Sequence, residues 1–482
     1  MSRTVTLSLI SHTNVGKTTL ARTLLRREVG EVFDQAHVTE VSEEHTLIQA
    51  GDASLQLWDT PGFGDLTRLM KRLRSENEPL GWLLHQVWDR VVNRSLWCSQ
   101  EAARNVKDEA DVVLYLVNAA EEPEDAGYIP PELELLTWIG RPVLVLLNQV
   151  GEGGEALEAR WRGFVPRWPI VRDVLSLDAF TRCWVEEDVL FRHVAEVLGG
   201  SKREAMVVLA REWNDRNLTT FRASCEAMAD YLIRTAADRE APGAAPDGDD
   251  AGGEGGILGD LTKTLKATTV DRKRAMAALN DRLDQATTAL MARLISEHGL
   301  YGESAAKIEQ RIQDFQVKGS TPLSERSSAI AGAVVSGALG GLAADALTGG
   351  LSLGGGMIAG GILGALGGAA LARGYRMVGG GDEPSVTWTP QFLDQLCRQV
   401  LLRYLAVAHF GRGRGPYRDL DRPARWSETV ERALAVHEAS LREIWESAER
   451  ETRKTGPLTK ILDSALRDVL RDGYPRAARL LT

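Results

Sequence analysis

The feature that most constrains the fold is a glycine-lysine-threonine triplet placed between an apolar run and a helical stretch. Residues 5–10 read VTLSLI, a pattern typical of a buried strand, and the loop 11–19 (SHTNVGKTT) follows directly. Such a loop directs successive backbone amides at phosphate oxygens, and the helix N-terminus adds its partial positive charge. The sequence therefore predicts a phosphate-binding P-loop, which requires a strand–loop–helix unit within an α/β domain.

The residue types in this loop assign a chemical role to each position. Lys17 would reach the β- and γ-phosphates, and the Thr18 hydroxyl would ligate Mg²⁺. Gly16 lets the backbone approach the phosphate, while Ser11 stands where the first glycine of the motif is usual. The predicted nucleotide-binding positions of the loop are Asn14, Val15, Gly16, Lys17, Thr18 and Thr19.

A second motif, DTPG at 59–62, closes a strand-like run further along the chain. An aspartate at a strand end suits contact with Mg²⁺ through water. The Gly62 amide can sense the γ-phosphate, so the loop after it would be a nucleotide-dependent switch. Thr39 is the candidate for a second switch residue that closes over Mg²⁺, with Thr46 as a competitor. The predicted catalytic set is Lys17, Thr18, Thr39, Asp59 and Gly62, of which Thr18, Thr39 and Asp59 would hold Mg²⁺.

The N-terminal part of the chain alternates strand-like and helix-like segments. The strand-like runs are 5–10, 46–48, 54–58, 112–117, 143–147 and 170–175. A tryptophan-rich stretch at about 65–109 is long for the connection it makes, so we expect one or two inserted helices there. The alternation predicts a doubly wound α/β domain with a mostly parallel sheet over residues 1–200.

Both motifs carry a resemblance to a known family. Residues 1–200 resemble the Era-like branch of the P-loop GTPases, which share the sequence motifs Asn-Val-Gly-Lys, here at 14–17, and Asp-Thr-Pro-Gly, here at 59–62. By its layout, the whole chain resembles a bacterial family of such GTPases that carries a C-terminal domain of unknown function 3482. The resemblance implies that the chain binds GTP and GDP, and that it hydrolyses GTP to GDP and phosphate with Mg²⁺.

The guanine-reading motif of these relatives, Asn-Lys-x-Asp, is incomplete in this chain. Asn148 is followed by Gln149 instead of the lysine that packs on the base, and Gly151 stands where a carboxylate would accept hydrogen bonds from guanine. Glu152 or Asp178 could supply that carboxylate. A carboxylate that accepts hydrogen bonds from guanine discriminates strongly between bases. Its loss at position 151 should therefore weaken the selectivity for guanine. The predicted base-side residues are Asn148, Gln149, Ser176 and Leu177.

The residue after the DTPG motif is Phe63, where Ras-type enzymes carry a glutamine that orients water. A phenyl ring cannot do this, so we expect slow hydrolysis. In some Era-like relatives a P-loop asparagine coordinates K⁺ in place of an arginine finger. Asn14 could do so here, or could only form hydrogen bonds within its loop. The basic residues Arg68, Lys71, Arg72 and Arg74 could supply a finger or form a solvated helix face.

Beyond residue 200 the sequence predicts helices and no further strands. A helical connector is expected at 201–240, followed by a flexible acidic linker at 241–256, which reads APGAAPDGDDAGGEGG. Helical periodicity resumes at 257–328. A glycine-rich apolar hairpin is expected at 329–372, and charged amphipathic helices are expected at 385–482.

The segment 329–372 carries no charge except Asp345. Small residues recur every four positions in two series, 332–344 and 356–368, which at helical spacing let two helices approach closely. Two arms of roughly twenty residues are long enough to enter or span a bilayer. The alternative is a hairpin buried among the flanking helices. We therefore expect the protein at the cytoplasmic face of the inner membrane, with lipid or a membrane protein as partner, and otherwise in the cytoplasm.

Composition and cysteine spacing argue against several classes of function. The formal net charge of −10 argues against a mainly nucleic-acid-binding surface, and the four cysteines show neither metal-ligand nor disulfide spacing. Two alternatives to a GTP-hydrolysing switch stay open. One is a membrane-associated helical scaffold whose nucleotide domain barely hydrolyses, and the other is an ATPase or promiscuous nucleoside triphosphatase. A nucleotide-dependent dimer is compatible with each.

Overall fold

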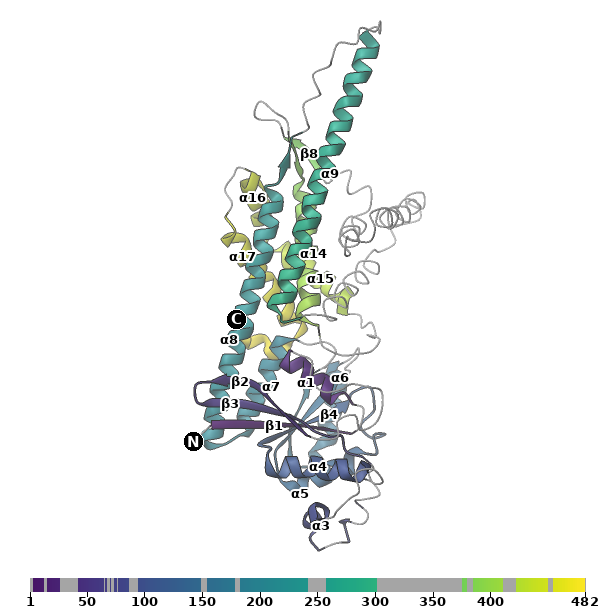
Figure 1. The fold of residues 1–482 in the computed structure, drawn as a ribbon, viewed down its shortest axis with the longest axis vertical. Helices are drawn as coiled ribbons and strands as arrows, with labels where there is room; N and C mark the ends of the chain where they lie inside the picture. The colour runs from purple at the N-terminus through teal and green to yellow at the C-terminus, as the bar shows by residue number, and fades with distance from the viewer. Residues whose placement is uncertain are drawn as a thin grey trace. The chain divides into compact units, whose positions relative to one another are not determined.

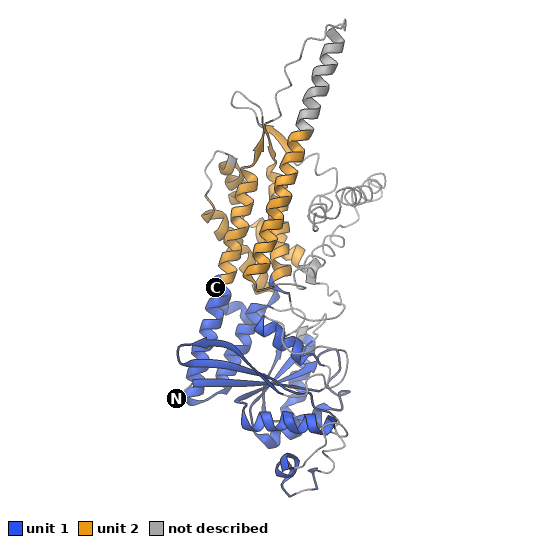
Figure 2. Ribbon diagram, in the orientation of Figure 1, with its two compact units in different colours: residues 1–219, 408–421, 473–482 blue, residues 220–407, 422–472 orange. Residues whose placement is uncertain are grey.

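The computed structural model describes most of the chain, in two compact units that are coloured separately in Figure 2. The described residues are 3–12, 15–26, 42–64, 66, 70, 73–75, 77–85, 94–148, 154–177, 183–241, 257–300, 375–378, 385–410, 422–449 and 454–481. Unit 1 comprises Met1–Thr219, Ala408–Asp421 and Gly473–Thr482. Unit 2 comprises Thr220–Val407 and Arg422–Asp472.

Unit 1 is built on a six-stranded sheet in the order β2-β3-β1-β4-β5-β6 (Figure 1). Its strands are β1 (Arg3–Ser11), β2 (Glu43–Ala50), β3 (Ala53–Asp59), β4 (Val112–Asn118), β5 (Val143–Asn148) and β6 (Val171–Ser176). Only the edge pair β2–β3 is antiparallel, while the other neighbours run parallel. The expected α/β class with a mostly parallel sheet is confirmed.

Side-chain alternation along the central strands places one core on each face of the sheet. On β4, Val112 and Leu114 belong to one apolar cluster, while Val113 and Tyr115 belong to the other. The first cluster includes residues of α1 (Lys17–Leu25), α7 (Trp184–Val197) and the start of α8 (Gly200–Ala236). The second includes residues of α4 (Arg94–Asp108), α5 (Ile129–Ile139) and α6 (Gly154–Phe164). The sheet is therefore doubly wound, with helices on both faces (Figure 1).

The stretch that follows β3 contains two helices in its described part, α3 (Pro79–His85) and α4. Leu83 of α3 is buried in the same core as α4, and the Gln100 side chain donates a hydrogen bond to the Leu83 carbonyl at 2.8 Å. Because this polar contact lies between two buried groups, it links α3 to α4. Apolar residues of α4 such as Val106 pack in the same core as the sheet.

Unit 2 is mainly helical. It contains the second part of α8, from Thr220, together with α9 (Ile257–Glu297), nearly all of α14 (Pro390–Ala408), α15 (Arg422–Ala435), α16 (Glu438–Glu449) and nearly all of α17 (Gly456–Gly473). The helices bury large side chains such as Trp445, whose indole nitrogen donates to Asp394 at 2.8 Å. The expected helical C-terminal half is confirmed.

The expectation of no strands beyond residue 200 is wrong. A three-stranded antiparallel sheet in unit 2 has the order β7-β9-β8, formed by β7 (Arg239–Glu240), β9 (Ser385–Trp388) and β8 (Tyr375–Val378). Trp388 stacks on Tyr375 at 4.8 Å between ring centroids, and on Phe392 at 4.2 Å. Strands this short carry no readable alternation, so their stability comes from aromatic stacking and from pairing with distant segments.

The glycine-rich segment 329–372 and most of the linker 241–256 lie outside the described residues. Within the part of the chain that the structure describes, no helix combines the length and apolarity needed to cross a membrane.

Candidate nucleotide-binding site

The P-loop connects β1 to α1, and its lysine lies inside unit 1. Lys17 is buried as the first residue of α1, and its Nζ donates a hydrogen bond to Ser11 Oγ at 3.0 Å. Burial lowers the pKa of Lys17, against the attraction of Asp59 and Glu132. An ammonium group held away from water is stabilised by additional negative charge. The position therefore favours an anionic ligand such as a phosphate group.

Thr18 and Asp59 contact each other beside this lysine. The Thr18 hydroxyl donates to Asp59 Oδ2 at 2.7 Å, and Asp59 is the last residue of β3. The other carboxylate oxygen, Asp59 Oδ1, is buried without a hydrogen-bond partner among the described residues. Burial raises the pKa of Asp59, while Lys17 opposes this shift. Hydroxyl and carboxylate oxygens are ligands that Mg²⁺ takes, so this pair fits a magnesium ion.

The start of the predicted switch is attached to the P-loop by backbone contacts. The Phe63 amide donates to the Ser11 carbonyl at 2.8 Å, and His12 and Phe63 form a parallel bridge. The next amide, of Gly64, donates to Ser99 Oγ of α4 at 3.0 Å. The Phe63 side chain is fully buried in the core between the sheet, α4 and α5. Its ring therefore anchors the segment and is turned away from solvent.

Asn148 connects the base side of the site to the phosphate side. It ends β5, is fully buried, and its Nδ2 donates to the Val15 carbonyl of the P-loop at 2.8 Å. On the neighbouring strand, Ser176 lies in register with Leu147, and the Leu177 amide donates to the Leu147 carbonyl at 3.1 Å. The predicted residues Asn148, Ser176 and Leu177 are therefore brought together at the carboxyl edge of the sheet, where α/β sheets bind ligands.

A buried polar network behind the P-loop was not anticipated from the sequence. Glu132 of α5 is fully buried and contacts His12 Nδ1 at 2.8 Å, while the Tyr115 hydroxyl donates to its other oxygen at 2.6 Å. Burial raises the pKa of Glu132, and the contacts with His12 and Tyr115 oppose the shift. The His12 ring also stacks on Tyr128 at 4.4 Å. One sequence feature indicates the burial of Glu132: it lies four residues before Leu136, on the apolar face of the same helix.

Several predicted positions lie outside the described residues. These are Asn14, Thr39, Arg68, Lys71, Arg72, Gln149, Gly151, Glu152 and Asp178. Arg74 is described, and its guanidinium pairs with Glu134 of α5, with Nε to Oε1 at 3.0 Å. The roles expected for Asn14 in K⁺ binding and for Thr39 in the switch therefore stay predictions.

Two family models match successive parts of the chain. Residues 6–149 match the sequence model of a family described as "50S ribosome-binding GTPase". Residues 171–463 match a family described as "Domain of unknown function (DUF3482)". No curated protein matches the chain significantly.

Solved structures that resemble the chain include two of Era. An Era variant from Aquifex aeolicus bound to GDP and AlF4⁻ is 19% identical over 41% of this chain and 57% of its own, with a TM-score of 0.31. Era in a complex with MgGDPNP and a segment of 16S ribosomal RNA is 18% identical over 42% of this chain and 58% of its own, again with a TM-score of 0.31. This chain thus spans less than two thirds of either Era chain.

The GTPase match covers most of β1, the P-loop, the DTPG motif and β5, which hold Lys17, Asp59 and Asn148, while Ser176 and Leu177 lie beyond it. The second match covers more than half of the 482 residues and includes most of the helices of unit 2. The chain therefore belongs to the family defined by the domain of unknown function DUF3482, and its residues 6–149 match a GTPase family model in addition.

Proposed function

We propose that the protein binds guanine nucleotides and hydrolyses GTP to GDP and phosphate with Mg²⁺. The observation that carries the proposal is the Lys17–Thr18–Asp59 group at the end of β1 and β3. It combines a buried ammonium group with a carboxylate oxygen, Asp59 Oδ1, that has no hydrogen-bond partner among the described residues. The phosphate oxygens of a nucleoside triphosphate would pair with the Lys17 ammonium group, and the divalent cation bound to the triphosphate would pair with the Asp59 carboxylate.

Each residue of this group would have one task in binding. Lys17 would donate charge-assisted hydrogen bonds to the β- and γ-phosphates, and Thr18 with Asp59 would hold Mg²⁺. The metal ion would neutralise phosphate charge. The Gly62 amide, one residue before the anchored Phe63, would donate to the γ-phosphate and make the switch sensitive to hydrolysis.

Hydrolysis should be slow. The Phe63 side chain is fully buried, so it has no means of orienting an attacking water. We infer that the protein acts as a switch with long-lived nucleotide states. Preference for guanine is supported by the family match of residues 6–149 and by the position of Asn148. It should be weaker than in relatives that carry an aspartate at the position of Gly151.

We also propose that the switch acts on the helical half of the chain at the cytoplasmic face of the inner membrane. The support is the apolar, glycine-rich sequence of 329–372 and the continuity of the GTPase domain with the DUF3482 region. The partner would be lipid or a membrane protein, and a dimer could form in one nucleotide state.

Nucleotide binding and multiple-turnover phosphate release test this function. We expect the wild-type chain to bind GDP and to release phosphate from GTP only with Mg²⁺, with ATP as a weaker competitor. Lys17→Ala should lower GDP affinity by about a hundredfold or more, because a buried charge-assisted phosphate contact is lost. Lys107→Ala, which removes an exposed lysine at the end of α4, is the matched control and should bind as the wild type does.

Three results would contradict the proposal. Unchanged GDP affinity in the Lys17→Ala variant would remove the site assignment. Equal competition by ATP and GTP would favour a promiscuous nucleoside triphosphatase. Tight GDP binding without turnover would favour the scaffold reading.

A further inference from the structure

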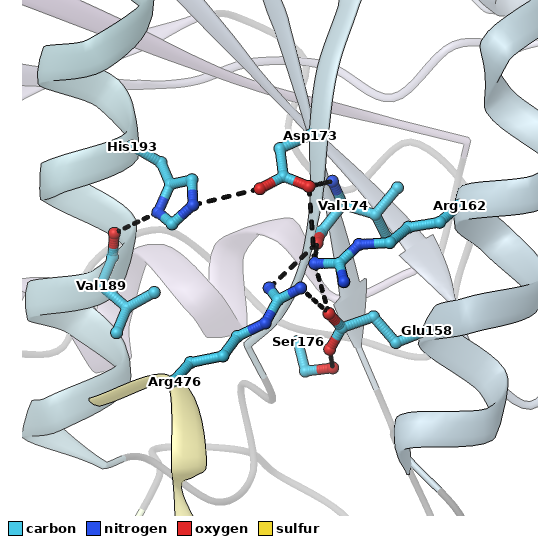
Figure 3. Close-up of polar contacts among 8 residues, drawn as sticks. All are labelled: Glu158, Arg162, Asp173, Val174, Ser176, Val189, His193 and Arg476. Atoms are coloured by element: carbon cyan, nitrogen blue, oxygen red, sulfur yellow. Dashed lines mark hydrogen bonds and ion pairs between the residues drawn. The ribbon is translucent and has the colours of Figure 1, made fainter. Parts of the chain in front are cut away.

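The C-terminal 3-10 helix η2 (Pro475–Leu480) contacts the sheet of unit 1 beside the carboxyl end of β6 (Figure 3). Arg476 forms an ion pair with Glu158 of α6, and its Nη1 donates to the Val174 carbonyl at 3.3 Å. The Arg476 side chain is 36% exposed and that of Glu158 only 12%. The contact therefore places a cation against a mostly buried carboxylate.

Glu158 connects this cation to the base side of the nucleotide site. Its Oε2 accepts a hydrogen bond from the Ser176 hydroxyl at 2.9 Å, and its Oε1 pairs with Arg162 at 2.7 Å. Ser176 is the last residue of β6 and lies in register with Leu147, the neighbour of Asn148. Arg476 and Arg162 therefore neutralise the carboxylate that restrains the final side chain of β6.

A second contact of the same C-terminal segment lies at the start of α7. The Tyr474 and Cys183 side chains form a hydrogen bond, and Cys183 is the N-cap residue of α7. The Tyr474 ring stacks on that of His409, another residue of unit 1, at 5.8 Å. The C-terminal segment thus reaches both Ser176, through Glu158, and Cys183. These residues end β6 and begin α7.

We propose that Arg476 is a positioning residue for nucleotide binding, acting through Glu158 on Ser176 at the base side of the site. This inference rests on the proposed function. Without Arg476, Glu158 loses one of the cations that neutralise it, and the hydroxyl of Ser176 is held less firmly. The end of β6 is then less well ordered in the nucleotide-free protein. Nucleotide affinity is lower, because part of the binding free energy is used to order Ser176.

The consequence is that nucleotide affinity depends on the last residues of the chain. Tyr474 and Arg476 directly follow α17 of unit 2 in the sequence. Any event that displaces this segment from β6 would accelerate nucleotide release, and by linkage bound nucleotide would hold the segment in place.

The experiment uses the full-length chain and a fluorescent GDP analogue. We expect Arg476→Ala to speed dissociation about three- to tenfold, the range of a partly buried charged contact. Arg476→Lys should recover part of the loss, because it keeps the charge but not the two-pronged geometry. Arg160→Ala removes an exposed arginine of the same helix that pairs with Glu122 instead of Glu158, and it should leave the rate unchanged.

A readout that separates positioning from general damage is binding of inorganic tripolyphosphate, which has no base. Its affinity should be the same in the wild type and in Arg476→Ala, since the P-loop is untouched. An unchanged dissociation rate in Arg476→Ala, a parallel loss of tripolyphosphate binding, or an equal effect of Arg160→Ala would each overturn the inference. Failure of the wild type to bind GDP would instead overturn the proposed function.

Discussion

Gly16 is the residue at which the phosphate side and the base side of the site meet. Its φ of +100° lies in the left-handed region, and a Cβ atom there would lie 2.9 Å from Asn148 Nδ2. Gly16→Ala should therefore strain the backbone, displace the Asn148 amide, and lower the free energy of unfolding by about 1–3 kcal/mol. GDP affinity should fall with it. Urea unfolding and GDP titration measure the two effects.

Gly163→Ala provides the control for that substitution. Gly163 lies in α6, and a Cβ atom there would meet no other atom within 4 Å. Alanine in a helix should be neutral or stabilising by up to about 1 kcal/mol. If Gly16→Ala binds GDP as tightly as Gly163→Ala does, the close approach at Gly16 is unimportant.

Arg403 of α14 is a buried cation in the helical unit. The side chain is 3% exposed, and its three nitrogen atoms have no hydrogen-bond partner among the residues that the structure describes. Burial lowers the pKa of Arg403 to about 10, and Tyr231 opposes the shift. Arg403→Met should raise the free energy of unfolding by about 1–3 kcal/mol, since an apolar side chain of similar length avoids desolvating a charge. Urea unfolding checks the sign.

The control on the same helix is Arg398→Met. Arg398 is 45% exposed and pairs with the exposed Glu431, so its replacement should change stability little. Destabilisation by Arg403→Met, with no effect at Arg398, would mean that the buried guanidinium is compensated in the folded chain.

At the level of residues, local motifs were predictable and long-range partners were not. Lys17 and Asp59 were identified because their roles depend on a few neighbouring residues and a strand before them. The contact between His12 and Glu132 joins positions 120 residues apart, and nothing near either residue indicates the other. The same holds for Arg476, whose partner Val174 lies 302 residues away in sequence.

Among the elements, β6 and α7 are joined by a titratable pair, Asp173 and His193, with Nε2 and Oδ2 3.1 Å apart. The hydrogen bond to Asp173 raises the pKa of His193 above 6.5, although burial opposes it. For Asp173, burial acts to raise the pKa, but His193, the Val174 amide and Arg162 together hold it below 3.8. Both groups are therefore charged over the pH range between the lowered pKa of Asp173 and the raised pKa of His193.

The sign of the pH dependence follows from these directions. His193 contributes stability that is complete below pH 6.5 and is lost as the pH rises through its raised folded value. Asp173 contributes stability above pH 3.8, which is lost as the pH falls through its lowered folded value. His193→Ala should therefore cost more free energy of unfolding at about pH 5.5 than at about pH 9. His85→Ala, which removes an exposed histidine at the end of α3, is the control, and an equal cost of His193→Ala at both pH values would contradict the assignment.

The elements of unit 1 were predictable to different degrees. Strands such as β4 and β5 are buried on both faces, so each reads as an uninterrupted apolar run. The small sheet of unit 2 was missed because β7 has two residues and pairs with Thr387 and Val386, far along the chain. Its residues have no periodicity of their own, and only the folded chain brings them together.

At the scale of the whole molecule, the order of domains along the sequence does not match the compact units. The region expected as one helical block at 385–482 is divided, because Ala408–Asp421 and Gly473–Thr482 belong to unit 1. The contacts of Arg476 and Tyr474 with α6 and α7 explain why the chain's end belongs there. The sequence around these residues does not indicate the contact, because Val174, a partner of Arg476, lies 302 residues away.

Membrane association also belongs to this scale, and it rests on residues 329–372, which lie outside the described part of the chain. Two arms of roughly twenty apolar residues can enter a bilayer while their helical hydrogen bonds satisfy the backbone. Asp345 opposes deep insertion, since a carboxylate at the centre of a bilayer costs at least about 2.5 kcal/mol. It stands three residues before the sequence TGG at 348–350, which is typical of a turn between the two arms, and from there it could reach the far interface.

We therefore expect the full-length protein to sediment with membranes or liposomes, and a Δ329–372 deletion to stay in the supernatant while still binding GDP. Leu363→Arg offers a second variant that keeps the segment but places a charge in one arm, and it should weaken sedimentation for the same desolvation reason. The matched control is Ser352→Arg, because this position adjoins the expected turn and its charge can reach water. If the full-length protein and all three variants remain in the supernatant, the segment packs within the protein. The switch would then act away from the bilayer.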